Sequence, residues 1–179
     1  MKFKVFKFRK VKSTNSTAVR IIKNSNYEYG MIISETQNSG RGQYGKKWIS
    51  LKGNLFVSFF YKTNSLVRSL KQTTKVNVLL VRKLLSKYYK KKIIFKKPND
   101  LMINKKKICG ILHETLTKLD KKYLIVGIGI NLVKSPKIRN YPTTNLYTLI
   151  KRKISKIKLE NELKEIFEQR LTRFYKIKD

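Results

Sequence analysis

The sequence predicts one α/β (α+β) domain, a mixed and largely antiparallel sheet with helices flanking it on one side. Apolar runs of strand length are interleaved with two longer segments of helical period, at 69–89 and 159–174. Hairpin patterns dominate the middle of the chain, whereas a doubly wound sheet would place a helix after nearly every strand. The 179 residues, 41% of them hydrophobic, are enough to bury a core.

The N-terminal part is expected to hold three strands and a short helix. Strands are predicted at 2–8, 31–36 and 54–61, and the last of these, NLFVSFFY, is the strongest strand pattern in the chain. The segment 13–17 is a run of Ser, Thr and Asn residues suited to a helix N-cap, and it precedes a helical start at 18–22.

The C-terminal part is expected to add a long helix, a meander of strands and a final helix. Residues 69–89 space their apolar side chains at helical intervals, and a short strand at 93–95 ends before Pro98. A hairpin is predicted from 101–103 and 108–116, followed by a strand at 122–132 and a loop at 136–144. The segment 159–174 fits one face of an amphipathic helix.

Charge is the unusual feature of the composition. There are 43 Lys and Arg residues against 10 Asp and Glu, a net charge of +33. A codon bias toward A and T and a selected basic surface explain this equally well, and such a field attracts acidic partners or nucleic acid without specificity.

Several classes of site are excluded by residue counts. The single cysteine, Cys109, allows no internal disulfide and no cysteine-built zinc site, and with one histidine, His113, we expect no metal site. The first eleven residues alternate apolar and basic side chains, unlike a signal peptide, and no apolar run reaches eighteen residues. We therefore expect a cytoplasmic protein with no membrane partner.

Four polar or glycine-bearing segments follow predicted strands, where site residues tend to gather. They are 13–15 (STN), 37–48 (QNSGRGQYGKKW), 96–100 (KKPND), and Lys107 with Gly110 and the run 127–131 (GIGIN). Each has an ordinary interpretation as a helix cap, a hairpin loop, a tight turn, or a solvated lysine with strand glycines. The glycine-rich loop also offers backbone amides for an anion, and Trp48 offers a flat face for stacking on a base.

Taken in this order, the segments resemble the catalytic domain of biotin–protein ligases. The resemblance covers essentially the whole chain and includes GNLFVS at 53–58 and KKICGIL at 106–112. It implies the fold shared with lipoate ligases and class II aminoacyl-tRNA synthetases. It also implies an ATP-dependent ligase that converts biotin to biotinyl-5′-adenylate. Biotin would then pass to one lysine of the biotin carboxyl carrier protein of acetyl-CoA carboxylase or a related carboxylase.

The resemblance assigns roles residue by residue. It implies catalytic roles for Lys107, Arg41, Asp100 and Lys96. The biotin site would comprise Ser13, Thr14, Asn15, Gln37, Arg41, Gly42, Gln43 and Lys107. The nucleotide site would comprise Gly40, Gly42, Gly45, Trp48, Asn99 and Asn131. Biotin and ATP would be substrates, with Mg²⁺ accompanying the nucleotide.

The chain also departs from the family pattern. Gln43 stands where the family often has arginine, which removes a cation near the adenylate phosphate, and Lys97 stands where it often has tryptophan. Neither an N-terminal helix-turn-helix domain nor a small C-terminal SH3-like barrel is expected within 1–179, so we expect no specific DNA binding. A homodimer is left open. The alternatives are a lipoate or octanoyl ligase or transferase of the same fold, and a basic nucleic-acid-binding module.

Overall fold

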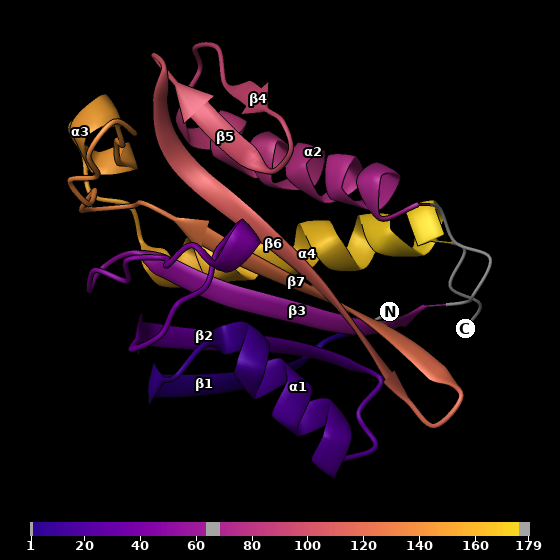
Figure 1. Cartoon of the computed structure of the whole chain (residues 1–179). Coiled ribbons are helices and arrows are strands. Elements are labelled where there is room, and N and C mark those ends of the chain that lie inside the picture. The colour runs from indigo at the N-terminus through magenta and orange to yellow at the C-terminus, as the bar shows by residue number, and fades with distance from the viewer. Residues whose placement is uncertain (1, 64–68, 176–179) are drawn as a thin grey trace.

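The computed structural model describes residues 2–63 and 69–175, and within them a twisted sheet runs through the centre of the molecule (Figure 1). Its strands are β1 (Lys4–Val11), β2 (Tyr29–Gln37), β3 (Leu55–Thr63), β4 (Ile94–Lys96), β5 (Asp100–Ile103), β6 (Lys106–Lys118) and β7 (Lys121–Ile130). The helices are α1 (Thr14–Asn24), α2 (Leu70–Tyr88), α3 (Leu146–Ile150) and α4 (Lys156–Tyr175), with a 3₁₀ turn η1 (Gln43–Gly45).

The sheet is mixed and mostly antiparallel, which confirms the predicted class. The order of the seven strands in the described part of the chain is β1-β2-β3-β7-β6-β5-β4. Only β1 and β2 pair in parallel, because α1 carries the chain back between them, and the other neighbours pair antiparallel. The predicted turn after β5 is a two-residue hairpin turn, with positive φ at Asn104 and Lys105.

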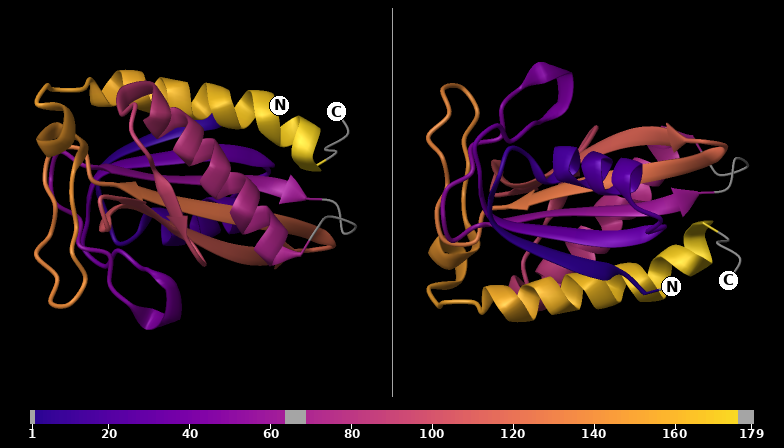
Figure 2. Two further views of the ribbon diagram at one scale, coloured as in Figure 1. Left: turned by 90° about the horizontal axis from the view of Figure 1, so that it is seen from above. Right: turned by 90° about the horizontal axis from the view of Figure 1, so that it is seen from below.

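Helices cover both faces of the sheet, so the expectation that they pack on one side is wrong. The helices α2 and α4 lie together over one face, and α1 lies on the other (Figure 2). The physical reason is β3, whose first seven residues, 55–61, are all buried. A strand with no exposed face needs apolar cover on both sides, and Ala18 and Ile22 of α1 supply it against Phe60.

Local sequence signals explain most helix boundaries. The helix predicted from the apolar spacing of 69–89 is α2, and Ser69 caps it in a capping box with Gln72. The five-residue α3, capped by Asn145, lies just after the loop predicted at 136–144 and was not foreseen, because it is too short to show a period. No helix among the described residues is both long and apolar enough to cross a membrane.

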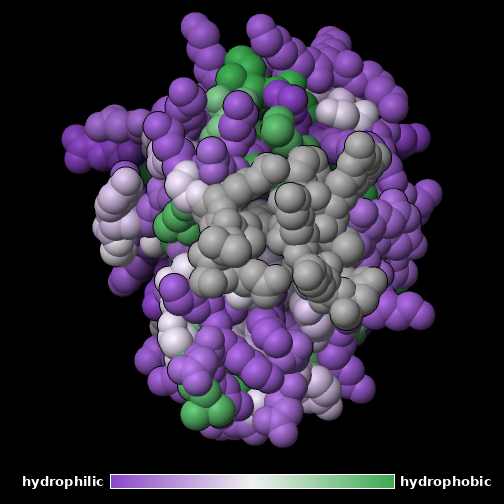
Figure 3. All heavy atoms as spheres, turned by 90° about the vertical axis from the view of Figure 1, so that its right-hand side faces the viewer, coloured by the Kyte–Doolittle hydropathy of each residue, from purple (hydrophilic) through white to green (hydrophobic). Residues whose placement is uncertain are grey.

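The surface reflects the lysine-rich composition. Outside the grey region, hydrophilic side chains dominate the face shown in Figure 3, with a few small hydrophobic patches. The buried side chains, by contrast, are mostly apolar, and they include the stacked rings of Phe59 and Phe167, 4.2 Å apart. The positive charge is therefore carried outside an ordinary core.

Candidate active site

A pocket of about 700 Å³ opens on the face of the sheet that carries α1. Along β7, the positions that face this side of the sheet are Tyr123, Ile125, Gly127 and Gly129 in turn. The first two pack in the cluster beneath α1. The two glycines that follow lack side chains, so they leave open space beside the N-terminus of α1, and they line the pocket.

Glycine is required at these positions because other side chains approach the backbone closely there. A Cβ atom on Gly127 would lie 2.4 Å from Asn15 Oδ1, and one on Gly129 would lie 2.4 Å from Trp48 Cε2. Gly110, the partner of Gly129 on β6, would place its Cβ 2.7 Å from Trp48 Cζ3. The prediction that the strand glycines mark a close approach is confirmed, and the approaching groups are themselves candidate site residues.

A bulge in β6 turns Lys107 toward the same pocket. The pairing with β5 skips Ile108, since Leu101 pairs with Cys109 and Met102 with Lys107. Without this extra residue, Lys107 and Gly110 would point to opposite faces of the sheet. With it, the ammonium of Lys107 lies 3.2 Å from the position of a Gly110 Cβ.

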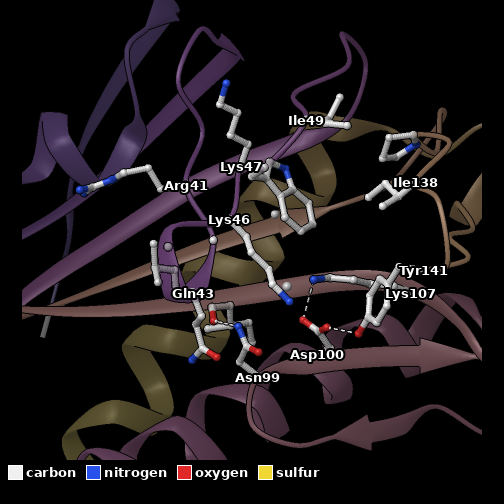
Figure 4. Close-up of a pocket in the computed structure, with 18 of the residues that line it drawn as sticks. Arg41, Gln43, Lys46, Lys47, Ile49, Asn99, Asp100, Lys107, Ile138 and Tyr141 are labelled. Carbon is white, nitrogen blue, oxygen red and sulfur yellow. Dashed lines mark hydrogen bonds and ion pairs between the residues drawn. The ribbon is translucent and has the colours of Figure 1, made fainter.

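Lys107, Asp100 and Tyr141 form a compact cluster on one wall of the pocket (Figure 4). Lys107 Nζ lies 2.8 Å from Asp100 Oδ1, and the two side chains are only 18% and 11% exposed. The Tyr141 hydroxyl donates a hydrogen bond of 2.6 Å to Asp100 Oδ2. Burial, followed by the interaction with the Asp100 carboxylate, raises the pKa of Tyr141 above its usual range, so the phenol remains a donor.

Tyr141 was not among the residues singled out from the sequence. It comes from the loop at 136–144, which was predicted as a loop without a function. Two backbone hydrogen bonds fix this loop to Lys107: Lys107 N–H donates to Pro142 O and Thr144 N–H donates to Lys107 O, both at 2.9 Å. No local pattern in the sequence indicates this pairing, because it joins residues more than thirty positions apart.

The opposite wall is a hydrogen-bonded polar network at the N-terminus of α1. Gln37 Oε1 accepts from both the backbone and the hydroxyl of Thr14, at 2.8 and 3.1 Å. Ser58 donates toward Thr14 Oγ1 and Asn15 Oδ1 from the adjacent strand β3. Thr14, Asn15 and Ser58 are all buried. The network therefore presents fixed polar groups to whatever fills the pocket.

Glu114 on β6 joins this network and was also missed. One of its carboxylate oxygens, Oε2, accepts from Asn15 Nδ2 at 2.7 Å and from Arg41 Nη2 at 2.8 Å. Arg41 thus lies along the pocket with its guanidinium paired to Glu114 instead of pointing inward (Figure 4). The sequence contains only a slight indication of a role for Glu114, namely that it is one of only ten acidic residues in the chain.

The glycine-rich loop closes the top of the pocket as a small hairpin. Arg41 and Lys47 form an isolated bridge, and Trp48 N–H donates to Gly40 O at 2.8 Å. In Figure 4, Lys46 points into the pocket toward the side that holds Asp100, whereas Lys47 points away. Lys46, three positions after Gln43, therefore supplies the pocket with a positive charge that the neutral Gln43 side chain does not.

Most candidate residues meet in the pocket. Those that line it are Ser13, Thr14, Asn15, Gln37, Arg41, Gly42, Gln43, Trp48, Lys96, Asn99, Asp100, Lys107 and Asn131. Gly40 lies beneath the loop, where a Cβ would meet Trp48 O at 2.5 Å, and Gly45 is outside the lining.

Three more of the lining residues also have structural partners. Ser13 Oγ accepts from Ser16 N–H as the N-cap of α1. Asn99 Nδ2 donates to Ile111 O at 2.7 Å, and Asn131 Nδ2 donates to Thr144 O at 3.1 Å. The interpretation of Ser13 as a helix cap and of Asn99 as a turn residue is therefore correct, and any ligand contact would come in addition.

Neither the cysteine nor a metal cluster belongs to this site. Cys109 is fully buried, and burial raises the pKa of its thiol above its usual range, so the thiol is not a nucleophile. In the part of the chain that the structure describes, no group of three or more His, Cys, Asp or Glu residues could hold a metal ion. The charged and hydrogen-bonding groups that the chain itself brings to the pocket include its lysines, the Asp100 carboxylate and the backbone amides of the glycine-rich loop.

Comparisons with known proteins agree on one family. The family model described as biotin/lipoate A/B protein ligase matches residues 7–131. The bifunctional ligase/repressor BirA of Bacillus subtilis (strain 168) is 30% identical over 126 residues, covering 69% of this chain and 39% of the relative. BirA of Escherichia coli (strain K12) is 34% identical over 102 residues, covering 56% and 32%.

A solved structure supports the same relation. The biotin protein ligase from Aquifex aeolicus in complex with biotin and ATP superimposes with a TM-score of 0.79 at 28% identity, covering 97% of this chain and 72% of that chain. The chain spans between about a third and two fifths of the length of the two BirA proteins.

Proposed function

Because the chain belongs to the biotin/lipoate A/B protein ligase family, we propose that it is an ATP-dependent biotin–protein ligase. Biotin would be activated to biotinyl-5′-adenylate with release of pyrophosphate. It would then be transferred to a lysine of a biotin carboxyl carrier protein. The observation that carries the proposal is the meeting of Lys107, Asp100, the α1 polar network and the glycine-rich loop around one pocket.

In the first step, two anions must be brought together. The biotin carboxylate attacks the α-phosphorus of ATP, so negative charge accumulates on the phosphoryl oxygens. Lys107 would leave Asp100 and bind the carboxylate, while Lys46 and the backbone amides of the glycine-rich loop would face the phosphate. The fixed polar groups of Thr14 and Asn15 would hold the ring end of biotin.

The nucleotide would lie against Trp48. Its indole covers Gly110 and Gly129, which leaves a flat aromatic face at the pocket. Mg²⁺ would be held mainly by the triphosphate and water, because Asp100 is the only carboxylate among the residues that line the pocket. When bound, the ion neutralises phosphate charge.

In the second step, the acceptor lysine needs a neutral amine. Asp100 would orient the incoming ammonium and take its proton, because its carboxylate lies beside Lys107 and faces the pocket. Lys96, whose ammonium lies 4.5 Å above the Tyr141 ring, would stay near the departing phosphate.

The test is transfer of labelled biotin to a purified carrier domain. The purified chain, ATP, Mg²⁺ and labelled biotin should label the carrier only when all four are present, and its lysine-to-arginine variant should stay unlabelled. Labelling by lipoate or octanoate instead would assign the chain to the other branch of the family. Tight DNA binding at physiological salt, with no labelling by any of these acids, would support the basic nucleic-acid-binding module.

A further inference from the structure

We propose that Tyr141 is a positioning residue for the transfer step, holding the Asp100 carboxylate so that one oxygen faces the arriving lysine. The inference rests on the proposed function and adds a residue to it. Its basis is the division of one carboxylate between two partners. Asp100 Oδ2 accepts from the Tyr141 hydroxyl, and Oδ1 faces the Lys107 ammonium.

The hydroxyl is held in place by the same residue that completes the cluster. Two backbone hydrogen bonds of Lys107, to Pro142 and from Thr144, fix the part of the loop that directly follows Tyr141. The Tyr141 ring also faces two cations, with Lys96 Nζ 4.5 Å and Lys107 Nζ 5.5 Å from its centroid. The position of the hydroxyl is therefore tied to the strand that carries Lys107.

This arrangement matters when a substrate arrives. Lys107 can neutralise a substrate carboxylate only by turning away from Asp100, and Asp100 Oδ1 then loses its cation. The bond from Tyr141 to Oδ2 does not depend on Lys107, so the carboxylate stays oriented. Oδ1, which the Lys107 ammonium no longer covers, is then the oxygen that meets the acceptor.

The chemistry of transfer uses that oxygen. The lysine nitrogen attacks the carbonyl carbon of the adenylate and forms the new C–N bond. The bond from that carbon to the phosphate oxygen breaks, and AMP leaves with the electron pair. Asp100 Oδ1 takes one proton from the ammonium before the attack, and the second proton that the nitrogen loses on forming the amide passes to solvent. A carboxylate that rotated freely would present this oxygen only part of the time.

The experiment separates the two half-reactions in four proteins: wild type, Tyr141→Phe, Asp100→Asn and the double variant. Pyrophosphate exchange reports activation, and single-turnover transfer from preformed adenylate to the carrier reports the second step. In Tyr141→Phe, the loss of a hydrogen bond to a charged group should slow transfer about tenfold. The KM for the carrier and the exchange rate should stay within about twofold, since Tyr141→Phe keeps the ring and removes only the hydroxyl that donates to Asp100.

The double variant distinguishes positioning from a structural role. If Tyr141 acts through Asp100, removing its hydroxyl should change nothing further in the Asp100→Asn background. Tyr147→Phe, a hydroxyl removed from an exposed tyrosine in α3, is the matched control and should behave as wild type.

Three outcomes would overturn the inference: wild-type transfer by Tyr141→Phe, equal losses in both half-reactions, or additive effects in the double variant. Failure of the wild type to exchange pyrophosphate with biotin would instead refute the proposed function, so the two failures are distinguishable.

Discussion

Replacing Lys107 with alanine should abolish most adenylation while leaving the fold intact. The ammonium lies in a wall where its side chain is only 18% exposed. At an effective dielectric constant of about 20, a unit charge about 4 Å from a substrate anion contributes about 4 kcal/mol. Part of this is offset by the cost of separating Lys107 from Asp100. We therefore expect the activation free energy to rise by about 3 kcal/mol, which slows exchange roughly a hundredfold.

The cost to stability should be smaller. Lys107→Ala leaves Asp100 without its ion pair, but the Tyr141 hydroxyl still donates to the other oxygen. We expect a decrease of about 1–2 kcal/mol in the free energy of unfolding, measured by urea denaturation.

The assay is biotin-dependent exchange of labelled pyrophosphate into ATP, with Lys106→Ala as the matched control. Lys106 is the preceding residue of β6 and is exposed, so its removal should change the rate by less than twofold. Near-normal exchange by Lys107→Ala, in protein shown to be folded, would refute the role assigned to this lysine. Equal losses in both variants would attribute the effect to general charge instead.

Three further predictions concern other parts of the molecule. Gln43→Arg should slow the release of biotinyl-adenylate less than Lys46→Ala accelerates it, because Lys46 already brings a cation to the pocket; adenylate dissociation rates measure both. Gly129→Ala should displace the Trp48 indole and weaken ATP binding, and fluorescence will show this directly because Trp48 is the only tryptophan. Burial lowers the pKa of His113 to about 4, so the folded state stays neutral where the unfolded state takes up a proton. The free energy of unfolding should therefore fall by about 2 kcal/mol between pH 7 and pH 5, and His113→Gln should remove this loss; urea denaturation at the two pH values is the check.

Strands with strong local patterns could be predicted from the sequence, but the side on which a helix packs could not. The run at 54–61 and the turn at Asn104 are local signals, and both appear in the structure. The position of α1 depends on how the chain crosses from β1 to β2, which the helix's own period does not encode. The available clue in the sequence was the nearly continuous apolar run LFVSFFY at 55–61, because a strand without a polar face needs cover on both sides.

The same distinction between local signals and long-range packing holds for the residues of the site. Its contiguous segments could be found because glycines, prolines and polar caps interrupt apolar runs. Glu114 and Tyr141 could not, since each acquires its role from a partner distant in sequence: Glu114 from Arg41 and Asn15, and Tyr141 from Asp100. The bulge that aims Lys107 is likewise a property of strand pairing. Long-range pairing is the physical information that a local pattern lacks.

The most direct measurement is exchange of labelled pyrophosphate into ATP by the purified chain, compared with biotin, with lipoate and with no acid. Exchange that requires biotin, and that lipoate does not support, is the predicted result. Exchange driven by lipoate and not by biotin would contradict the assignment, and an absence of exchange with either acid, in folded protein with Mg²⁺ present, would contradict the activation chemistry itself.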